Sequence, residues 1–132
     1  MHFEVDSSPV GNGHALRVAV HGELDIASSE RLKRAADAAI VGIQPLILDL
    51  ADCSFIDSRG LGLILQIHKE LSDRGGPSVG MAIVIGESLT RRLFTLTAID
   101  RTVPLFPTLE RAGVWLDTQR RSNGTQSSAK LA

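Results

Sequence analysis

An aspartate and a serine, Asp57 and Ser58, stand directly before a stretch with helical spacing. A serine hydroxyl can accept a phosphoryl group, which adds about −1.5 to −2 charge and three acceptor oxygens. The N-terminus of a helix tolerates such an anion, because it offers unpaired N–H donors and the positive end of the helix dipole. At a docked interface the same charge beside Asp57 would be costly. The pair therefore indicates either a phosphorylation switch or an ordinary helix cap.

Catalysis by the same residues is a further interpretation. Ser58 and Asp57 could form a hydrolase triad with one of the histidines. However, Ile56 stands where the nucleophile elbow of hydrolases has its first glycine. The single cysteine, Cys53, has no base near it in the sequence. Neither pattern favours an enzyme.

Nucleotide and metal binding have less support still. The pair Gly60 and Gly62 lacks the remaining glycine of a dinucleotide-binding fingerprint, so no cofactor is predicted. The two glycines instead allow a backbone to approach this turn closely. Metal sites need His or Cys at ligand spacing. That spacing is missing from the four histidines, which are His2, His14, His21 and His68.

These candidate residues belong to a predicted strand–loop–helix unit. Residues 46–50 form a short apolar run that is typical of a strand buried on both faces. A polar break at 51–54 and the apolar pair 55–56 follow. Ser58 is the predicted N-cap of the helix. One buried stripe is predicted along this helix, formed by Leu61, Ile64, Leu65, His68 and Leu71.

A β-hairpin is predicted before this unit. Residues 2–6 and 15–21 alternate between polar and apolar, and the Pro, Gly and Asn residues between positions 7 and 13 favour a turn. A second turn is predicted at 22–25, where the second strand ends.

A helix is predicted after the hairpin, over residues 27–41. Ser28 or Ser29 can cap its start, and Gly42 marks its end. Its predicted stripe towards the core consists of Leu32, Ala35, Ala36, Ala39, Ile40 and Ile43.

The C-terminal third is predicted to hold two strands and two helices. The strands cover 79–85 and 103–106, and the second belongs at a sheet edge because of Pro104. Thr108 would cap a last helix that ends near Leu116.

The other helix of this third is predicted over residues 88–96. Its arginines belong either to a solvated face or to a partner-binding rim. The spacing places Leu89, Leu93 and Leu96 inward and leaves Arg91 and Arg92 more exposed.

Together these elements define an α/β fold in the order strand–strand–helix–strand–helix–strand–helix–strand–helix. Strands separated by helices pair in parallel through right-handed crossovers, whereas the first two strands pair antiparallel. A mixed β-sheet with helices packed against it is therefore expected, in a single domain over residues 1–117. Residues 118–132 are mostly polar or small and are predicted to form a disordered tail, whose Ala-Lys-Leu-Ala ending resembles vector sequence.

The composition excludes several classes of function. The 132 residues carry a net charge of −1, without the basic field that nucleic-acid binding needs. No apolar segment approaches the roughly 18 residues of a membrane span, and no signal-peptide pattern opens the chain. A single cysteine suits the reducing cytosol. The expected protein is cytoplasmic and binds neither nucleic acid nor membrane.

Residues 55–62, Phe-Ile-Asp-Ser-Arg-Gly-Leu-Gly, resemble the signature of the anti-sigma factor antagonists, the stand-alone bacterial members of the STAS domain family. Blocks at 18–25 and 91–94 match in the expected order, so the resemblance covers roughly residues 14–117. It implies a STAS-like fold. It also implies that Ser58 is the serine phosphorylated by a partner that is both anti-sigma factor and serine kinase. The family usually has Ser or Thr at the next position, where this chain has Arg59.

The resemblance thus implies a binding module that is a kinase substrate and not an enzyme. Without phosphate on Ser58 it would bind the anti-sigma factor and free a sigma factor for transcription; phosphate would break the complex, and a phosphatase would restore it. A rival interpretation, favoured by Arg59, is a STAS module of a sensor or transport complex in which Ser58 is never phosphorylated. A small serine hydrolase is the other rival. The expected partner-binding residues are Asp25, Asp57, Arg59, Gly60, Leu61 and Gly62.

Overall fold

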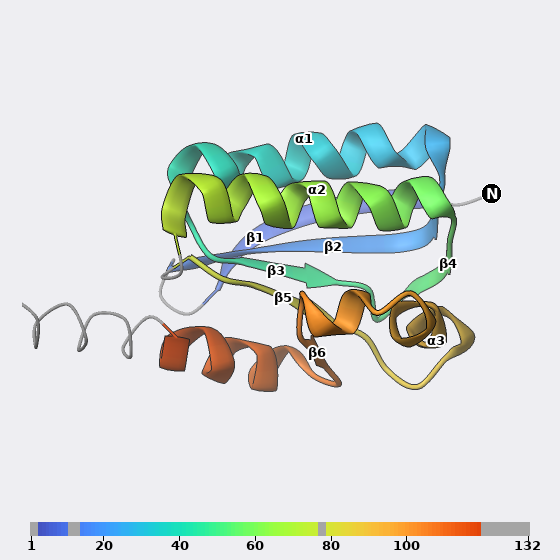
Figure 1. Ribbon diagram of the computed structural model, residues 1–132. Coiled ribbons are helices and arrows are strands. Elements are labelled where there is room, and N and C mark those ends of the chain that lie inside the picture. The colour runs from blue at the N-terminus through green and yellow to red at the C-terminus, as the bar shows by residue number, and fades with distance from the viewer. Residues whose placement is uncertain (1–2, 11–13, 77–78, 120–132) are drawn as a thin grey trace, which may run out of the picture.

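A mixed six-stranded β-sheet forms the middle of the molecule, with helices on both faces (Figure 1). The computed structural model describes residues 3–10, 14–76 and 79–119. The predicted α/β class with a mixed sheet is confirmed. The strands are β1 (Phe3–Val10), β2 (Ala15–Leu24), β3 (Leu46–Asp49), β4 (Cys53–Ile56), β5 (Met81–Val84) and β6 (Leu105–Phe106). The helices are α1 (Ile26–Gly42), α2 (Ser58–Gly75), α3 (Leu89–Leu96), the short 3₁₀ helix η2 (Ile99–Arg101) and a last helix over 109–119.

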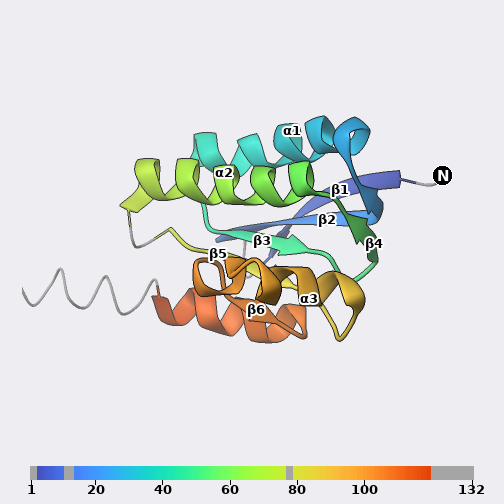
Figure 2. The same ribbon diagram turned by 45° about the vertical axis from the view of Figure 1, so that its right-hand side comes forward.

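The strand order is β1-β2-β3-β5-β6, and β4 pairs with β2 beyond the end of β3. β1 and β2 pair antiparallel, as predicted, while the other described pairs are parallel. α1 and α2 pack side by side on one face of the sheet, and α3 and the last helix lie on the other (Figures 1 and 2). The sheet is therefore covered on both sides, as its largely parallel pairing requires.

Two apolar clusters lie on the two faces of the sheet. The larger cluster joins the sheet to the helices α1 and α2 and also includes Phe94 of α3, Ile99 of η2 and Val103. β3 and β5 are buried along their whole length, which explains why their sequences are continuous apolar runs without alternation. The smaller cluster packs the last helix against the sheet and consists of Ala15, Ile47, Ala82, Val84, Ala112 and Leu116.

The first strand is longer than predicted. β1 extends to Val10 and includes Pro9, which an edge strand accommodates because its outer N–H groups need no partner in the sheet. Residues 11–13 of the predicted turn lie outside the described residues.

The second strand also continues further, and the turn predicted at 22–25 is wrong. β2 runs to Leu24. Gly22 has a positive φ of 98°, and the pairing register shifts between Gly22 and Glu23. A β-bulge therefore carries the strand through the position where its glycine indicated a turn.

The strand β4 is missing from the predicted order of elements. Residues 51–54 are predicted as a polar break, yet Cys53 and Ile56 are buried while the two residues between them are exposed. Such a four-residue alternation is too short to stand out in a sequence. The strand forms because β2 outlasts β3, which leaves the Gly22–Leu24 segment of β2 free to pair with β4.

The N-caps of the two long helices are aspartates, not the predicted serines. Asp57 caps α2, so Ser58 is its first helical residue. Asp25 caps α1, and Ser28 is the third residue of a capping box. An aspartate in extended conformation directly before the helix outcompetes a serine one or more residues later, since it reaches the N–H groups of the first turn.

The buried stripe of α2 is rotated from the predicted one. Leu65 is exposed and His68 only half-buried, whereas Ile67 is buried. The face towards the sheet is centred on Gly60, Ile64, Ile67 and Leu71. In α1 the predicted stripe holds except at Ile43, which follows the helix end at Gly42 and is exposed.

The C-terminal elements follow the predicted order, with one added 3₁₀ helix. β6 lies at the sheet edge, as Pro104 indicated. The backbone N–H of Arg111 donates to Thr108 Oγ1 at 3.2 Å, which confirms the predicted cap of the last helix. That helix continues past Leu116 to residue 119, and residues 120–132 of the predicted tail lie outside the described residues.

Candidate functional site

Two parallel strands bring the predicted site residues to one edge of the sheet. Leu24 at the end of β2 and Ile56 at the end of β4 are register partners. Asp25 and Asp57 follow directly, and each caps the helix that starts there. The N-termini of α1 and α2 consequently lie at the same end of the molecule (Figure 2). Segments that are more than thirty positions apart in the sequence form one surface.

Ser58 is available for modification. It is the first residue of α2, its side chain is exposed, and its hydroxyl makes no hydrogen bond within the described residues. The neighbouring carboxylate is fixed instead: Asp57 Oδ1 accepts from the backbone N–H of Gly60 at 2.8 Å. The backbone N–H of Asp57 in turn donates to the carbonyl of Leu24 at 3.1 Å. A rigid carboxylate therefore stands beside a free hydroxyl.

Asp25 is held just as firmly at the start of α1. Its Oδ1 accepts from the backbone N–H groups of Ala27 and Ser28 at 3.0 and 3.1 Å. The Ser28 hydroxyl accepts from the backbone N–H of Asp25 at 2.8 Å, which completes the capping box. Each aspartate thus faces the positive end of a helix dipole, an arrangement that stabilises a helix by about 0.3–1 kcal/mol.

The remaining predicted site residues differ in their exposure. Arg59 and Gly62 are exposed, Leu61 is half-buried against the core, and Gly60 is buried. Arg59 makes no ion pair or hydrogen bond with its side chain among the described residues.

Gly60 and Gly62 have opposite structural roles, which the free energies of unfolding of their alanine variants should show. A Cβ at Gly60 would lie 2.9 Å from Ile56 Cγ2 and 3.0 Å from the Leu24 carbonyl oxygen, whereas a Cβ at Gly62 would meet no atom within 4 Å. We expect Gly60→Ala to lower the free energy of unfolding by about 1–3 kcal/mol. Gly62→Ala should raise it by up to about 1 kcal/mol, because alanine favours a helix. Urea denaturation of both variants checks this, and equal changes would contradict it.

A further exposed surface lies on α3, the helix whose arginines the sequence assigned either to a solvated face or to a partner-binding rim. Thr90 and Phe94 are the buried residues of that helix, so the predicted inward face is wrong. Leu89 and Leu96 are 79% and 80% exposed. Spacing alone does not separate the two faces, since Leu89 and Leu93 are four positions apart and so are Thr90 and Phe94. Only the packing of Phe94 into the core reveals the true orientation.

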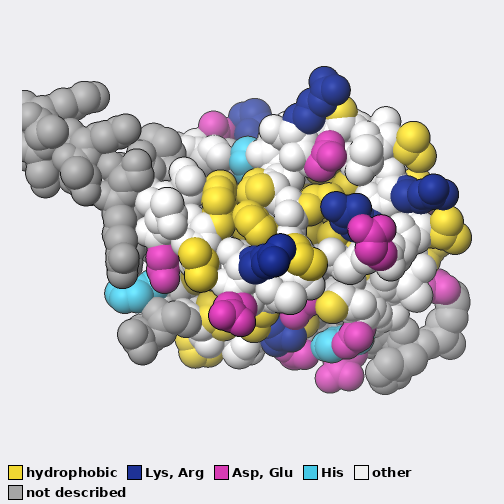
Figure 3. Space-filling view, turned by 90° about the horizontal axis from the view of Figure 1, so that it is seen from below, with side chains coloured by type: hydrophobic (Ala, Val, Ile, Leu, Met, Phe, Trp, Pro, Cys, Tyr) yellow, Lys and Arg dark blue, Asp and Glu magenta, His cyan; other side chains and the backbone are white. Residues whose placement is uncertain are grey.

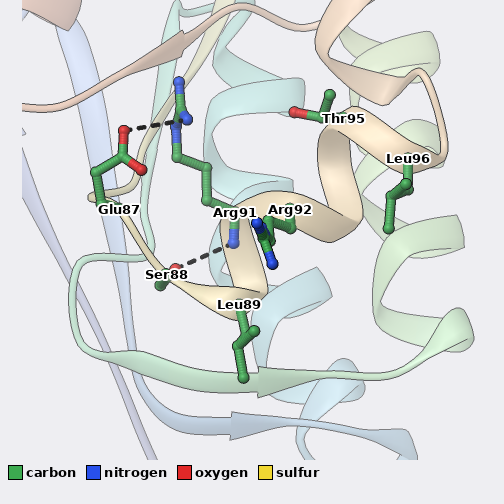
Figure 4. Close-up of a pocket in the computed structure, with 7 residues that line it drawn as sticks. All are labelled: Glu87, Ser88, Leu89, Arg91, Arg92, Thr95 and Leu96. Carbon is green, nitrogen blue, oxygen red and sulfur yellow. Dashed lines mark hydrogen bonds and ion pairs between the residues drawn. The ribbon is translucent and has the colours of Figure 1, made fainter.

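The exposed face of α3 borders an open hollow of about 640 Å³. Leu89, Arg92 and Leu96 project away from the helix, while Arg91 turns towards Glu87 and pairs with it at 3.4 Å (Figure 4). The helix α3 packs against β4, the strand that leads into Asp57. Phe55 of β4 is itself 48% exposed. Large apolar side chains with this exposure are candidates for an interaction surface.

Other chemistry finds little support in the described residues. Among them no group of three or more His, Cys, Asp or Glu could hold a metal ion. Burial raises the pKa of the Cys53 thiol, which makes it a poor nucleophile. None of the helices searched is long and apolar enough to cross a membrane.

Comparison with known proteins identifies the family. The model of the STAS domain matches residues 8–112. The chain belongs to the STAS domain family, as the resemblance of residues 55–62 predicted. An anti-sigma-F factor antagonist, RsfB of Mycobacterium tuberculosis, is 34% identical over 76% of this chain and 80% of its own length. The anti-sigma F factor antagonist of Paenibacillus polymyxa is 31% identical over 69% of this chain and 77% of its own length.

Solved structures agree with this assignment. An anti-sigma factor antagonist from Mycobacterium paratuberculosis superimposes with a TM-score of 0.73 at 28% identity, covering 86% of this chain and 95% of its own. The phosphorylated form of SpoIIAA, a cell fate determinant of Bacillus, gives a TM-score of 0.61 at 25% identity over 83% of this chain and 96% of its own. The relatives of this chain are thus regulators of anti-sigma factors with the same fold.

Proposed function

We propose that this protein is an anti-sigma factor antagonist that works by partner switching, with Ser58 as its switch. The observation that carries the proposal is the exposed, unbonded hydroxyl of Ser58 beside the fixed carboxylate of Asp57. With Ser58 unmodified, the protein binds an anti-sigma factor and releases its sigma factor. Phosphate on Ser58 breaks that complex, and transcription that depends on the sigma factor stops. Such a circuit operates in the cytoplasm.

Electrostatics explain why one phosphate can act as a switch. In the free protein the phosphate of Ser58 would stand in water at the N-terminus of an 18-residue helix, where an anion is tolerated. In a complex the same group, with about −1.5 to −2 charge, would be enclosed together with Asp57 and Asp25. Like charges that are removed from water repel strongly. The fold is therefore spared while the interface is lost.

The kinase activity and the nucleotide are assigned to the partner. Within the described residues this chain offers neither a metal-binding group of side chains nor a glycine-rich phosphate loop. An anti-sigma factor with serine kinase activity binds ATP and Mg²⁺ and phosphorylates Ser58. A phosphatase removes the phosphate and returns the protein to its binding state. A relative with the same fold, SpoIIAA, exists in a phosphorylated form, which supports a phosphate as part of the cycle.

The docking surface that we propose extends over the carboxyl edge of the sheet. It comprises the predicted residues Asp25, Asp57, Arg59, Leu61 and Gly62, with Gly60 keeping α2 close to β2. The exposed face of α3 and Phe55 adjoin it and add apolar area. A polar centre around the switch with apolar anchors at its side is an arrangement that suits specific binding.

One second function is favoured by a specific residue. Arg59 stands where the family usually has Ser or Thr, and its charge lies next to the hydroxyl that a kinase must reach. A STAS module of a sensor or transport complex, in which Ser58 stays unmodified, would tolerate this residue. The serine hydrolase has less support, because Ser58 has no hydrogen bond to a histidine among the described residues.

Phosphate transfer to Ser58 is the experiment that tests the proposal. The purified protein is incubated with ATP, Mg²⁺ and each kinase-type anti-sigma factor of its own genome, and mass spectrometry locates the phosphate. We expect phosphate on Ser58, loss of partner binding, and no modification of Ser58→Ala. Ser54→Ala is the matched control, since Ser54 is also exposed and lies just upstream; it should be modified like the wild type.

Two other outcomes would redirect the proposal. Tight binding without phosphate would define a constitutive antagonist, and Arg59→Ser would then show whether the arginine blocks the kinase. Neither binding nor phosphate with any candidate would overturn the partner-switching proposal in favour of the sensor or transport module.

A further inference from the structure

His21 lies between two carboxylates that come from different parts of the chain. Its Nε2 is 2.9 Å from Asp6 Oδ2 on β1, and its Nδ1 is 3.0 Å from Asp52 Oδ2 in the turn between β3 and β4. The histidine itself belongs to β2. One imidazole ring therefore bridges the edge strand β1 and the β3–β4 turn.

This geometry selects one protonation state. A neutral imidazole has one N–H donor and one acceptor nitrogen, so it can satisfy only one of two carboxylates. The imidazolium donates from both nitrogens. With both ring nitrogens at hydrogen-bond distance from carboxylate oxygens, the arrangement requires the charged form.

The charges around the ring favour the imidazolium as well. From β1, Glu4 is the cross-strand partner of His21, and Asp6 accepts one of its hydrogen bonds. From β2 itself comes Arg17, which also pairs with Asp6. Acidic groups outnumber basic ones on this patch. Figure 3 shows a histidine and a basic side chain among several acidic side chains at the lower border of the face.

Arg17 and the remaining acids complete the network. Arg17 Nη2 pairs with the buried Asp49 of β3 at 2.9 Å, and Arg17 Nη1 pairs with Asp6 at 3.4 Å. Asp49 is thus held by Arg17, whereas Asp52 pairs with His21. The hydrogen bonds that His21 donates to Asp6 and Asp52 raise its pKa above the ordinary value of 6.5, although partial burial opposes the rise.

The turn that His21 holds leads directly into the candidate site. The backbone carbonyl of Asp52 accepts from the N–H of Gly22 at 3.1 Å, and Cys53 begins β4 as the register partner of Gly22. β4 ends at Ile56, immediately before Asp57 and Ser58. Among the described strands, β4 pairs only with β2. The start of β4 is therefore attached to β2 at the same place where the side chain of Asp52 bonds to His21.

We propose that His21 is a positioning residue whose protonated ring fastens the β3–β4 turn, and thereby β4 and the site that follows it, to the hairpin β1–β2. When the ring loses its proton, Asp6 and Asp52 have only one N–H donor between them, so the attachment of the turn to the hairpin weakens. The proposal concerns this chain alone and does not depend on a partner; its consequence for docking at Ser58 rests on the proposed function.

The sign of the pH dependence follows from the direction of the shift. A group whose pKa is higher in the folded than in the unfolded protein stabilises the fold fully below the unfolded value. For His21 this contribution is complete below about pH 6.5 and disappears as the pH rises through the higher folded pKa. Fastening is therefore strongest in mildly acidic solution and weakest in mildly alkaline solution.

Nuclear magnetic resonance of the full chain tests the proposal. The ring resonances of His21, assigned with His21→Gln, should titrate above pH 6.5. Hydrogen exchange should show that the protection of the Gly22 and β4 amides falls several-fold between pH 6 and pH 8.5, beyond the intrinsic base-catalysed acceleration. The amides of the central strand β5 should keep their protection and serve as the internal reference.

Variants separate the fastening from a general loss of stability. Asp52→Asn keeps the size of the side chain but removes one carboxylate, so the pKa of His21 should fall relative to the wild type and the pH dependence at Gly22 should shrink. His14→Gln, at an exposed histidine of the same hairpin, should change neither. A His21 pKa at or below 6.5, or equal protection of Gly22 at both pH values, would overturn the proposal.

Discussion

Ser58→Asp should abolish binding of the anti-sigma factor while leaving the fold of the antagonist intact. We expect the dissociation constant to rise by at least about 100-fold, which corresponds to roughly 2.7 kcal/mol. The free energy of unfolding should change by less than about 0.5 kcal/mol, because the residue is exposed and acidic residues are favoured in the first turn of a helix. Titration calorimetry with the partner and urea denaturation measure the two quantities.

The reason for the large effect is the fixed position of the neighbouring charge. Asp57 cannot swing away from a second carboxylate, because its Oδ1 is held by the N–H of Gly60 at 2.8 Å and that bond caps α2. In the free protein water screens the pair. In a complex the pair would lose that water, and the repulsion would fall entirely on the interface.

A neutral variant of the same size is the matched control. Ser58→Asn has nearly the shape of Ser58→Asp without its charge, so it should bind within a few-fold of the wild type. Ser58→Ala should bind as well and remain bound in the presence of ATP. If Ser58→Asn loses binding as completely as Ser58→Asp, the position is controlled by shape, and the electrostatic mechanism fails.

Much of the site was accessible from the sequence because its parts are local. An apolar strand, an Asp-Ser pair and a helical stripe follow one another within residues 46–71, and each is defined by its own spacing. The family resemblance placed Asp25 and Asp57 together among the expected partner-binding residues. Their positions in the fold have a physical basis, since each follows directly on a strand end and those ends, Leu24 and Ile56, are register partners.

The missed features depend on tertiary contacts. The sequence of residues 51–54 contains no strand pattern. β4 forms because β2 continues through a bulge at Gly22 and offers an unpaired edge. The cap positions were misplaced by one residue at α2 because Asp and Ser are both good caps. The end of β4 at Ile56 determines that the next residue, Asp57, is the N-cap.

The orientation of α3 is the clearest case. Leu89, Leu93 and Leu96 match a core stripe better than Thr90 and Phe94 do on hydrophobicity alone. Phe94 nevertheless enters the core, where its whole ring is buried, and this contact fixes the orientation of the helix about its axis. A helix of eight residues has room for one such anchor, and the larger side chain decides.

Phe94→Ala and Leu96→Ala should therefore have opposite consequences, although they lie two positions apart on α3. Phe94 is fully buried, and its truncation should lower the free energy of unfolding by about 3–5 kcal/mol. Leu96 is 80% exposed, so its truncation should change stability by less than about 0.5 kcal/mol. Urea denaturation of the two variants gives this comparison directly.

Binding of the anti-sigma factor should respond in the reverse sense. If the exposed face of α3 belongs to the docking surface, Leu96→Ala should weaken binding by about tenfold or more, the effect of removing an interface anchor. Val114→Ala is the control, because Val114 is also an exposed apolar residue, 61% accessible, and belongs to the last helix instead of α3; it should bind normally. Wild-type affinity of Leu96→Ala would confine docking to the N-termini of α1 and α2. An equal loss of affinity in Leu96→Ala and Val114→Ala would show that the partner covers both α3 and the last helix.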